Sequence, residues 1–155
     1  MKRIAVVDTT FARVDMGSVV EEELSRLGTG FQVQRTTVPG IKDLAVACKR
    51  LLEDGCDLAL ALGMPGPDPL DRQSALTADW GLQQAQLLTN KHILGVFVYE
   101  EEGQDFRNLK WLAEQRAREH ARNAFQILFQ PEKLRRRAGT GQREGFEDVG
   151  PLVAD

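Results

Sequence analysis

The feature that most constrains this chain is an apolar run of strand length, which occurs four times. Each run is followed by a polar or Gly/Pro break and then by a helical pattern; the runs are Ile4–Val7, Phe31–Arg35, Leu58–Leu62 and Ile93–Val98. Strands that alternate with helices predict an α/β fold with a parallel sheet. Because parallel strands all point the same way, the four breaks should meet at the carboxyl edge of the sheet, where open α/β folds bind ligands.

The spacing of apolar residues predicts the helices. We expect them over about 15–27, 41–54, 71–89 and 106–129, because apolar residues recur there at intervals of three and four. In the third helix one side carries Leu76, Trp80, Gln84, Leu87 and Leu88. The prolines Pro65, Pro67 and Pro69 should keep the segment before it non-helical. The second strand is polar enough for a sheet edge, whereas the third is wholly apolar and should be central.

Length and composition exclude several classes of protein. A chain of 155 residues predicts one domain, and a net charge of -3 gives no electrostatic footprint for nucleic-acid binding. No apolar run is long enough for a signal peptide or a membrane span. The two cysteines, Cys48 and Cys56, have no zinc-site spacing and form no disulfide framework. We therefore expect a cytoplasmic protein without a metal site.

The character of the chain changes at Pro131. From there to residue 155 the sequence is rich in arginine and glycine, which is typical of a solvated tail. We divide the chain into an α/β domain over 1–130 and a C-terminal extension over 131–155. The extension is expected to pack on its own subunit or on a neighbouring one.

The breaks after the strands resemble one family over long motifs. The segments that are similar to the archaeal-type riboflavin synthases are Asp8–Met16, Thr37–Leu44, Ala61–Gly66, Gln86–Ile93 and Gly145–Asp148. The resemblance implies a lumazine-synthase-like fold: a three-layer α/β/α domain whose four-stranded parallel sheet has the order 2-1-3-4. It also implies a homopentamer with active sites between adjacent subunits.

The resemblance implies a reaction as well. Two molecules of 6,7-dimethyl-8-ribityllumazine exchange a four-carbon unit and give riboflavin and 5-amino-6-ribitylaminouracil. No redox cofactor is expected, because one substrate molecule is the donor and the other the acceptor. A dependence on Mg²⁺ is left open, since no cluster of residues argues for one. No nucleic-acid or membrane partner is expected.

The site residues follow from the matching loops. Phe11 is expected to stack on the heterocycle, Asp43 to hold the ribityl chain, and the amides of Ile41 and Lys42 to face a ring carbonyl. The full set of expected substrate-binding residues is Thr9, Thr10, Phe11, Pro39, Gly40, Ile41, Lys42, Asp43, Gly63, Met64, Pro65 and Gly66.

The third helix departs from the family. Its pattern there is Cys-Ala-His-Glu-Ala-Ser, whereas this chain has Ser-Ala-Leu-Thr-Ala-Asp over 74–79, with Leu76 and Thr77 in place of the histidine and glutamate. Proton transfer would then fall to other groups, of which Ser74, Asp71 and Asp79 are nearby. We name as catalytic candidates Ser74, Asp71 and also His92, which could reach a neighbour's site. The other histidine, His120, lies in an apolar stripe and is expected to be a packing residue.

Three alternative functions stay open at this point. The departure at Leu76 and Thr77 favours a non-catalytic protein that binds lumazine or flavin. A lumazine synthase would need a phosphate clamp, for which Arg116, Arg118 and the arginines of the extension are candidates. A generic flavodoxin-like module would explain the topology but not the specific breaks.

Overall fold

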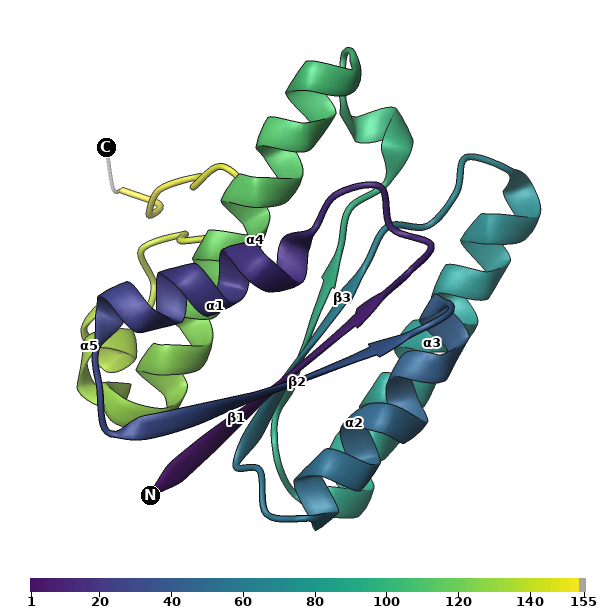
Figure 1. Cartoon of the computed structure of the whole chain (residues 1–155). Coiled ribbons are helices and arrows are strands. Elements are labelled where there is room, and N and C mark those ends of the chain that lie inside the picture. The colour runs from purple at the N-terminus through teal and green to yellow at the C-terminus, as the bar shows by residue number, and fades with distance from the viewer. Residues whose placement is uncertain (154–155) are drawn as a thin grey trace.

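Four parallel strands form one sheet in the computed structural model, which describes residues 1–153 (Figure 1). The strands are β1 (Lys2–Thr9), β2 (Phe31–Val38), β3 (Leu58–Gly63) and β4 (Ile93–Phe97), and their order is β2-β1-β3-β4. The predicted fold class and strand order are therefore confirmed. Every residue of β3 is buried, as its wholly apolar sequence predicts, while β2 lies at one edge and is only partly buried.

Helices cover both faces of the sheet. One face packs against α1 (Met16–Leu27) and α4 (Phe106–Phe129), and the other against α2 (Leu44–Glu53) and α3 (Pro69–Thr89) (Figure 1). Short 3₁₀ turns over Ile41–Asp43 (η1) and Glu100–Glu102 (η2) precede α2 and α4, and a short helix, α5 (Pro131–Arg136), follows α4. Part of the predicted second helix is thus a 3₁₀ turn.

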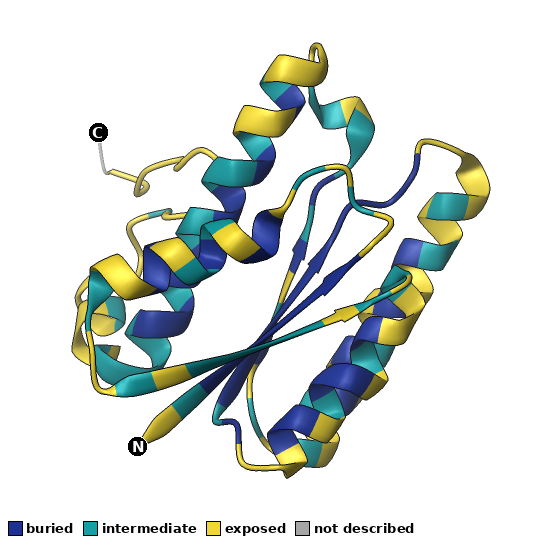
Figure 2. Cartoon of the chain, in the orientation of Figure 1, coloured by how far each residue is buried: buried dark blue, intermediate teal, exposed yellow. Residues whose placement is uncertain are grey.

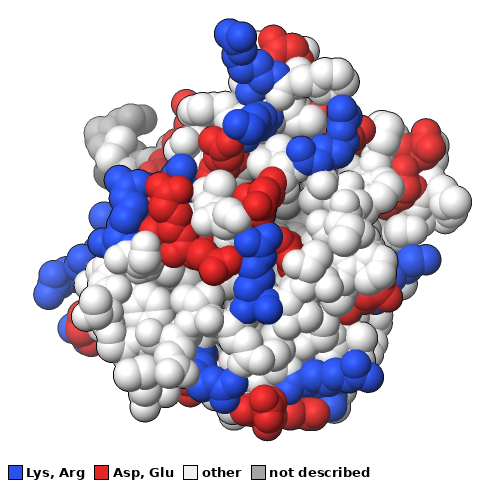
Figure 3. All heavy atoms as spheres, in the orientation of Figure 1, with Lys and Arg blue, Asp and Glu red and all other residues white. Residues whose placement is uncertain are grey.

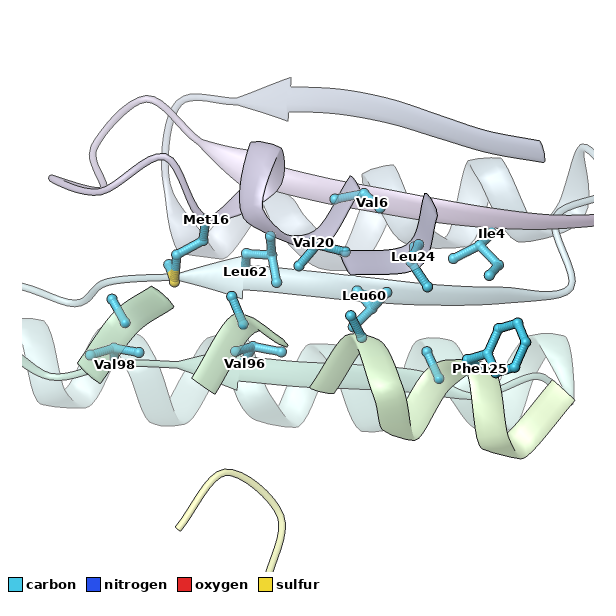
Figure 4. Close-up of a cluster of buried hydrophobic side chains, with 14 of the residues drawn as sticks. Ile4, Val6, Met16, Val20, Leu24, Leu60, Leu62, Val96, Val98 and Phe125 are labelled. Atoms are coloured by element: carbon cyan, nitrogen blue, oxygen red, sulfur yellow. The ribbon is translucent and has the colours of Figure 1, made fainter. Parts of the chain in front are cut away.

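Two apolar layers hold the sheet between the helices. Figure 4 shows the layer on the α1 and α4 face, where Val20 and Leu24 of α1 lie over Leu60 and Leu62 of β3. The buried residues are concentrated in the central strands and on the inner sides of the helices (Figure 2). On the face drawn in Figure 3, basic and acidic side chains are interspersed, without a continuous basic patch.

The start of α3 corrects one expectation. Pro69 was expected to be non-helical, but it is the first residue of α3. A proline is tolerated there because the first turn of a helix leaves its N–H groups without partners in any case. Asp68 precedes it, and the Asp71 carboxylate accepts a hydrogen bond from the Asp68 N–H at 3.1 Å.

The large apolar residues of α3 face away from the sheet. The buried side of the helix consists of Ala75, Ala78, Leu82 and Ala85. Leu76, Trp80 and Leu87 share the opposite side and are 73%, 68% and 83% exposed. Small residues let α3 approach its neighbour closely: a Cβ at Gly81 would lie 3.2 Å from that of Ala45 in α2. The exposed set Leu76, Trp80 and Leu87 is called the α3 stripe below.

The extension returns to α4 beyond α5 (yellow trace in Figure 1). Gly145 is buried, and a Cβ there would lie 2.8 Å from both Arg116 Cγ and His120 Nε2. His120 is 4% exposed, in accord with its expected packing role, and its Nδ1 lies 3.1 Å from Glu144 Oε1. No helix in the described part of the chain combines the length and apolarity that a membrane span requires.

Candidate active site

A cavity of about 240 Å³ lies at the carboxyl edge of the sheet. The loops after β1, β2 and β3 and the first turns of α3 form its walls. It is lined by Phe11, Gly40, Ile41, Lys42, Asp43, Pro65, Gly66, Asp71 and Ser74. We call it the first cavity. The structure thus brings together residues that the sequence predicted to converge, although they come from four separate segments of the chain.

The loop after β1 places Phe11 at the rim of this cavity. The N–H groups of Thr10 and Phe11 donate to the carbonyls of Val38 and Pro39, at 2.9 and 3.3 Å. The Thr10 hydroxyl also donates to the Pro39 carbonyl, at 3.2 Å. These bonds fix the backbone of the loop against the end of β2, while the side chain of Phe11 stays 58% exposed. An exposed ring on a held backbone is a suitable platform for a flat heterocycle.

A partly buried group of ion pairs lies at the base of the same loop. Arg35 of β2 contacts the carboxylates of Asp8 at 2.5 Å and Asp15 at 2.6 Å, one on each side of the loop. Asp8 is 6% exposed and also accepts a hydrogen bond from the Thr37 hydroxyl at 2.6 Å. Gly17 leaves room for this group, since a Cβ there would lie 2.5 Å from Arg35 Cζ. Arg35 therefore holds the two ends of the loop that carries Phe11.

Two carboxylates of the first cavity have one oxygen occupied. Asp43 Oδ2 accepts from the Gly40 N–H and Asp71 Oδ2 from the Asp68 N–H, each at 3.1 Å. Oδ1 of each accepts no hydrogen bond within residues 1–153. Gly66 is required beside Asp71, because a Cβ at Gly66 would lie 2.5 Å from Asp71 Oδ2. The two free oxygens are acceptors of the kind that a polyol chain needs.

Several predicted binding residues lie outside this cavity. Gly63 and Met64 are buried, and a Cβ at Gly63 would lie 2.8 Å from Ile41 Cγ2. Thr9 is buried, and its hydroxyl accepts from the Ala12 N–H at 3.1 Å. Thr10 and Pro39 act through the loop contacts given above. These residues shape the walls and do not line them.

His92 lies apart from the other catalytic candidates. It is exposed and directly precedes β4, so it lies at the amino edge of the sheet, opposite the first cavity. Its carbonyl accepts a hydrogen bond from the Ala59 N–H at 3.0 Å. Within one chain the structure therefore brings Ser74 and Asp71 to the cavity but not His92.

A second, larger cavity of about 550 Å³ lies on another side of α3. It is lined by Arg72, Leu76, Asp79, Tyr99, Glu101 and Glu102. We call it the second cavity. Leu76, one of the two departures noted in the sequence of the third helix, thus lines this cavity. The residues after β4 were not among the predicted site residues. The acidic break over 99–102 was nevertheless one of the four breaks expected at the carboxyl edge of the sheet.

Arginines neutralise both glutamates of the second cavity. Arg72 pairs with Glu101, and the guanidinium of Arg116 donates to both oxygens of Glu102 at 2.8 and 3.0 Å. Arg116 is 4% exposed and also donates to the carbonyls of Phe97 at 3.2 Å and Gly145 at 2.9 Å. Its role was not foreseen, because one arginine among many on a helix gives no signal of burial.

The electrostatics of the second cavity shift three pKa values. Partial burial raises the pKa of Asp79. Burial together with the nearby charges of Asp79, Glu102 and Glu101 raises the pKa of Tyr99. Burial also opposes the charge of Glu102, but the hydrogen bonds from Arg116 and the Tyr99 N–H prevail and lower its pKa. Glu102 is thus held ionised, while Asp79 is shifted towards the protonated form.

The described residues offer no clear metal site or reactive thiol. Within 1–153 there is no cluster of three or more His, Cys, Asp or Glu residues that could hold a metal ion. Both cysteines are buried and free, and burial raises the pKa of Cys48 to about 12. A thiol in that state is a poor nucleophile at neutral pH.

Comparison with known proteins shows the family. Residues 1–132 match the model of the 6,7-dimethyl-8-ribityllumazine synthase family. The chain belongs to this family.

Curated relatives cover nearly the whole chain. The riboflavin synthase of Methanothermobacter marburgensis is 56% identical over 153 residues, which is 98% of this chain and 100% of the relative. The riboflavin synthases of Archaeoglobus fulgidus and Aeropyrum pernix are each 45% identical over 152 residues, which is 97% of this chain and 99% and 98% of those relatives. The similarity therefore includes the C-terminal extension, beyond the segment that the family model matches.

Proposed function

We propose that this chain is a riboflavin synthase. It would convert two molecules of 6,7-dimethyl-8-ribityllumazine into riboflavin and 5-amino-6-ribitylaminouracil by transfer of a four-carbon unit. The observation that carries the proposal is the 45–56% identity, over nearly the full length, to archaeal proteins named riboflavin synthase. The cavities at the carboxyl edge supply the groups that such a substrate needs.

The first cavity suits one lumazine molecule. The ring of Phe11 would stack on the heterocycle, and the main-chain N–H groups of Ile41 and Lys42 would face its carbonyl edge. The free oxygen of Asp43 would accept hydrogen bonds from the ribityl hydroxyls. Gly40 and Gly66 let the backbone approach the ligand closely.

Catalysis in this proposal consists mainly of positioning. Holding two lumazines face to face would lower the activation barrier by about 7 kcal/mol or more in the best cases. The reason is that binding has already removed the translational and rotational freedom that the reactants would otherwise lose on the way to the transition state. A proton shuttle at the acidic C7 methyl would add roughly 10²–10⁴-fold. Ser74 and Asp71 line the first cavity and are the candidates there.

We further propose that the active unit is a homopentamer with sites between adjacent copies. The α3 stripe supports an interface between copies, since three large apolar residues share one exposed side of α3. The two cavities lie on different sides of α3, so two substrates within one copy could not meet face to face. The free thiols support a reducing, cytoplasmic location.

Anaerobic incubation of the purified protein with 6,7-dimethyl-8-ribityllumazine tests the reaction. Chromatography should show riboflavin and the uracil diamine in equal amounts, formed faster than in a sample without protein. The assay is run both with and without Mg²⁺. Quenching of substrate fluorescence at low protein concentration, without turnover, would instead establish a binding protein. If neither turnover nor binding is found, the chain shares only its fold with the relatives.

A second candidate is a lumazine synthase, which the name of the matching family model favours. That reaction joins the uracil diamine to a four-carbon phosphate and needs a basic phosphate clamp. Arg116 is not available for such a clamp, because it is buried and paired with Glu102. Incubation with the diamine and the four-carbon phosphate, followed by lumazine absorbance, distinguishes the two: formation of lumazine would support this candidate.

A further inference from the structure

The second cavity contains one carboxylate that no arginine neutralises. Glu101 is paired with Arg72 and Glu102 with Arg116. Asp79 makes neither an ion pair nor a hydrogen bond within residues 1–153 that the structure records. The two carboxylates of the first cavity each have one oxygen bound to a helix-start N–H, as described above. Asp79 is thus the carboxylate in either cavity with both oxygens free.

Asp79 is exposed in the single chain, but one side of its carboxylate lies against β4. Its Oδ1 lies 3.7 Å from the place that a Cβ would take at Gly95, so the carboxylate lies beside β4, where the strand has no side chain. The charged or titratable groups that line the same cavity are Arg72 from α3 and Tyr99, Glu101 and Glu102 from the segment after β4. The nearest residue of β4, Gly95, adds none.

Asp79 lies on the same side of α3 as the residue that departs from the family pattern. Residues three apart on a helix are neighbours on its surface, and Leu76 and Asp79 line the same cavity. Leu76 cannot transfer a proton. The helix nevertheless keeps a carboxylate in this cavity, one turn further along.

We propose that Asp79 is the catalytic proton acceptor for the lumazine bound in the second cavity. Its carboxylate takes a proton from the C7 methyl: the C–H bond breaks, its electron pair stays on the substrate as a carbanion delocalised into the ring, and an O–H bond forms on Asp79. As the four-carbon unit moves, carbon–nitrogen bonds of the donor break and carbon–carbon bonds to the acceptor form. The proton returns to a nitrogen of the departing uracil diamine, and the two substrate molecules account for all atoms of the two products. No oxidant or reductant is needed.

This role rests on the proposed riboflavin synthase function. It also agrees with the electrostatics, since a general base works best when its pKa lies near the operating pH and burial raises the pKa of Asp79 in that direction.

Deuterium exchange provides a test that does not depend on turnover. The C7 methyl signal of 6,7-dimethyl-8-ribityllumazine is followed by proton NMR in D₂O, with and without protein. Wild-type protein should accelerate the exchange, and Asp79→Asn should lower both this acceleration and kcat by about 10²-fold or more. Fluorescence quenching by the substrate should persist, because the amide has nearly the same size as the carboxylate.

Two further variants separate chemistry from structure. Asp79→Glu keeps a carboxylate and should recover part of the exchange. Asp54→Asn serves as the matched control, because Asp54 is exposed beyond the end of α2, at the opposite edge of the sheet, and should behave like wild type. In wild type, kcat should fall as the pH decreases through the pKa of Asp79, and this fall should begin at a higher pH than an ordinary aspartate would give. The same fall at low pH, the acid limb of the profile, should persist in Asp79→Glu.

The outcomes distinguish this role from the proposed function. If wild type produces riboflavin and Asp79→Asn exchanges the methyl protons equally fast, the role of Asp79 is overturned and the function stands. If wild type produces no riboflavin, the function falls and the role of Asp79 falls with it. Should Asp79→Asn fail to fold, as judged by circular dichroism, the acid limb of Asp79→Glu decides: its absence overturns the role.

Discussion

Replacing Arg116 by methionine should destabilise the protein more than any exposed charge substitution. The guanidinium is 4% exposed and connects three segments: the end of β4 at Phe97, the η2 turn at Glu102 and the extension at Gly145. Methionine can fill much of the same volume but leaves the Glu102 carboxylate and two carbonyls without their donor. The ring of Phe146 also loses a cation 4.3 Å from its centroid.

The expected magnitude follows from these contacts. Breaking a buried ion pair by removing one partner costs about 3–5 kcal/mol. The Glu102 side chain is 24% exposed, so water can replace part of the contact that the substitution removes. We therefore expect the free energy of unfolding to fall by about 3 kcal/mol, or a decrease of about 10 °C in Tm for a chain of this size.

Denaturant unfolding followed by circular dichroism measures the effect. All variants are compared at one protein concentration, because assembly shifts apparent stability. The matched control is Arg135→Met, whose pair with Glu132 is 81% and 63% exposed and should be worth at most about 1 kcal/mol. An Arg116→Met protein as stable as the control would refute the reasoning that this arginine joins the three segments.

Three other predictions concern binding, assembly and pH. Phe11→Ala should weaken lumazine binding by about 10-fold through loss of stacking, as measured by fluorescence quenching; unchanged affinity would remove Phe11 from the site. Trp80→Asp should dissociate the assembly in sedimentation experiments, and an intact assembly would show that the α3 stripe is not an interface. Since Glu102 has a pKa below its ordinary value of 4.5, the stability that it contributes is complete above that pH and is lost as the pH falls through the lower value. Glu102→Gln should therefore show a shallower acid loss in unfolding titrations; an equally steep loss would assign it to other carboxylates.

The sheet and the first cavity were predictable because local signals and topology agree. The burial of β3 follows from its apolar run, and the parallel arrangement alone brings Phe11, Asp43 and Gly66 to one edge. The roles of Gly63 and Met64 were less accessible, since a Gly-rich break gives the same signal whether it contacts a ligand or the core.

The buried side of α3, the start of that helix and the burial of Arg116 could not be predicted, because they depend on contacts with other parts of the fold. The apolar residues of α3 recur at helical spacing, but spacing does not say which side meets the sheet, and here the alanines do. Pro69 begins a helix because its missing N–H costs nothing at that position. The burial of Arg116 results from a carbonyl that lies 29 residues further along the chain, and no local pattern reports such a contact.

The contact between α4 and the extension also sets an order on biosynthesis. During translation the four strands and α4 emerge before Gly145, so the guanidinium of Arg116 is without one of its carbonyl partners until the segment around Gly145 leaves the ribosome. Arg116 can then bond Glu102 and Phe97 first and gain its contact with the extension late, after the sheet has formed. A nascent chain can thus be folded at its centre before its extension is attached to α4.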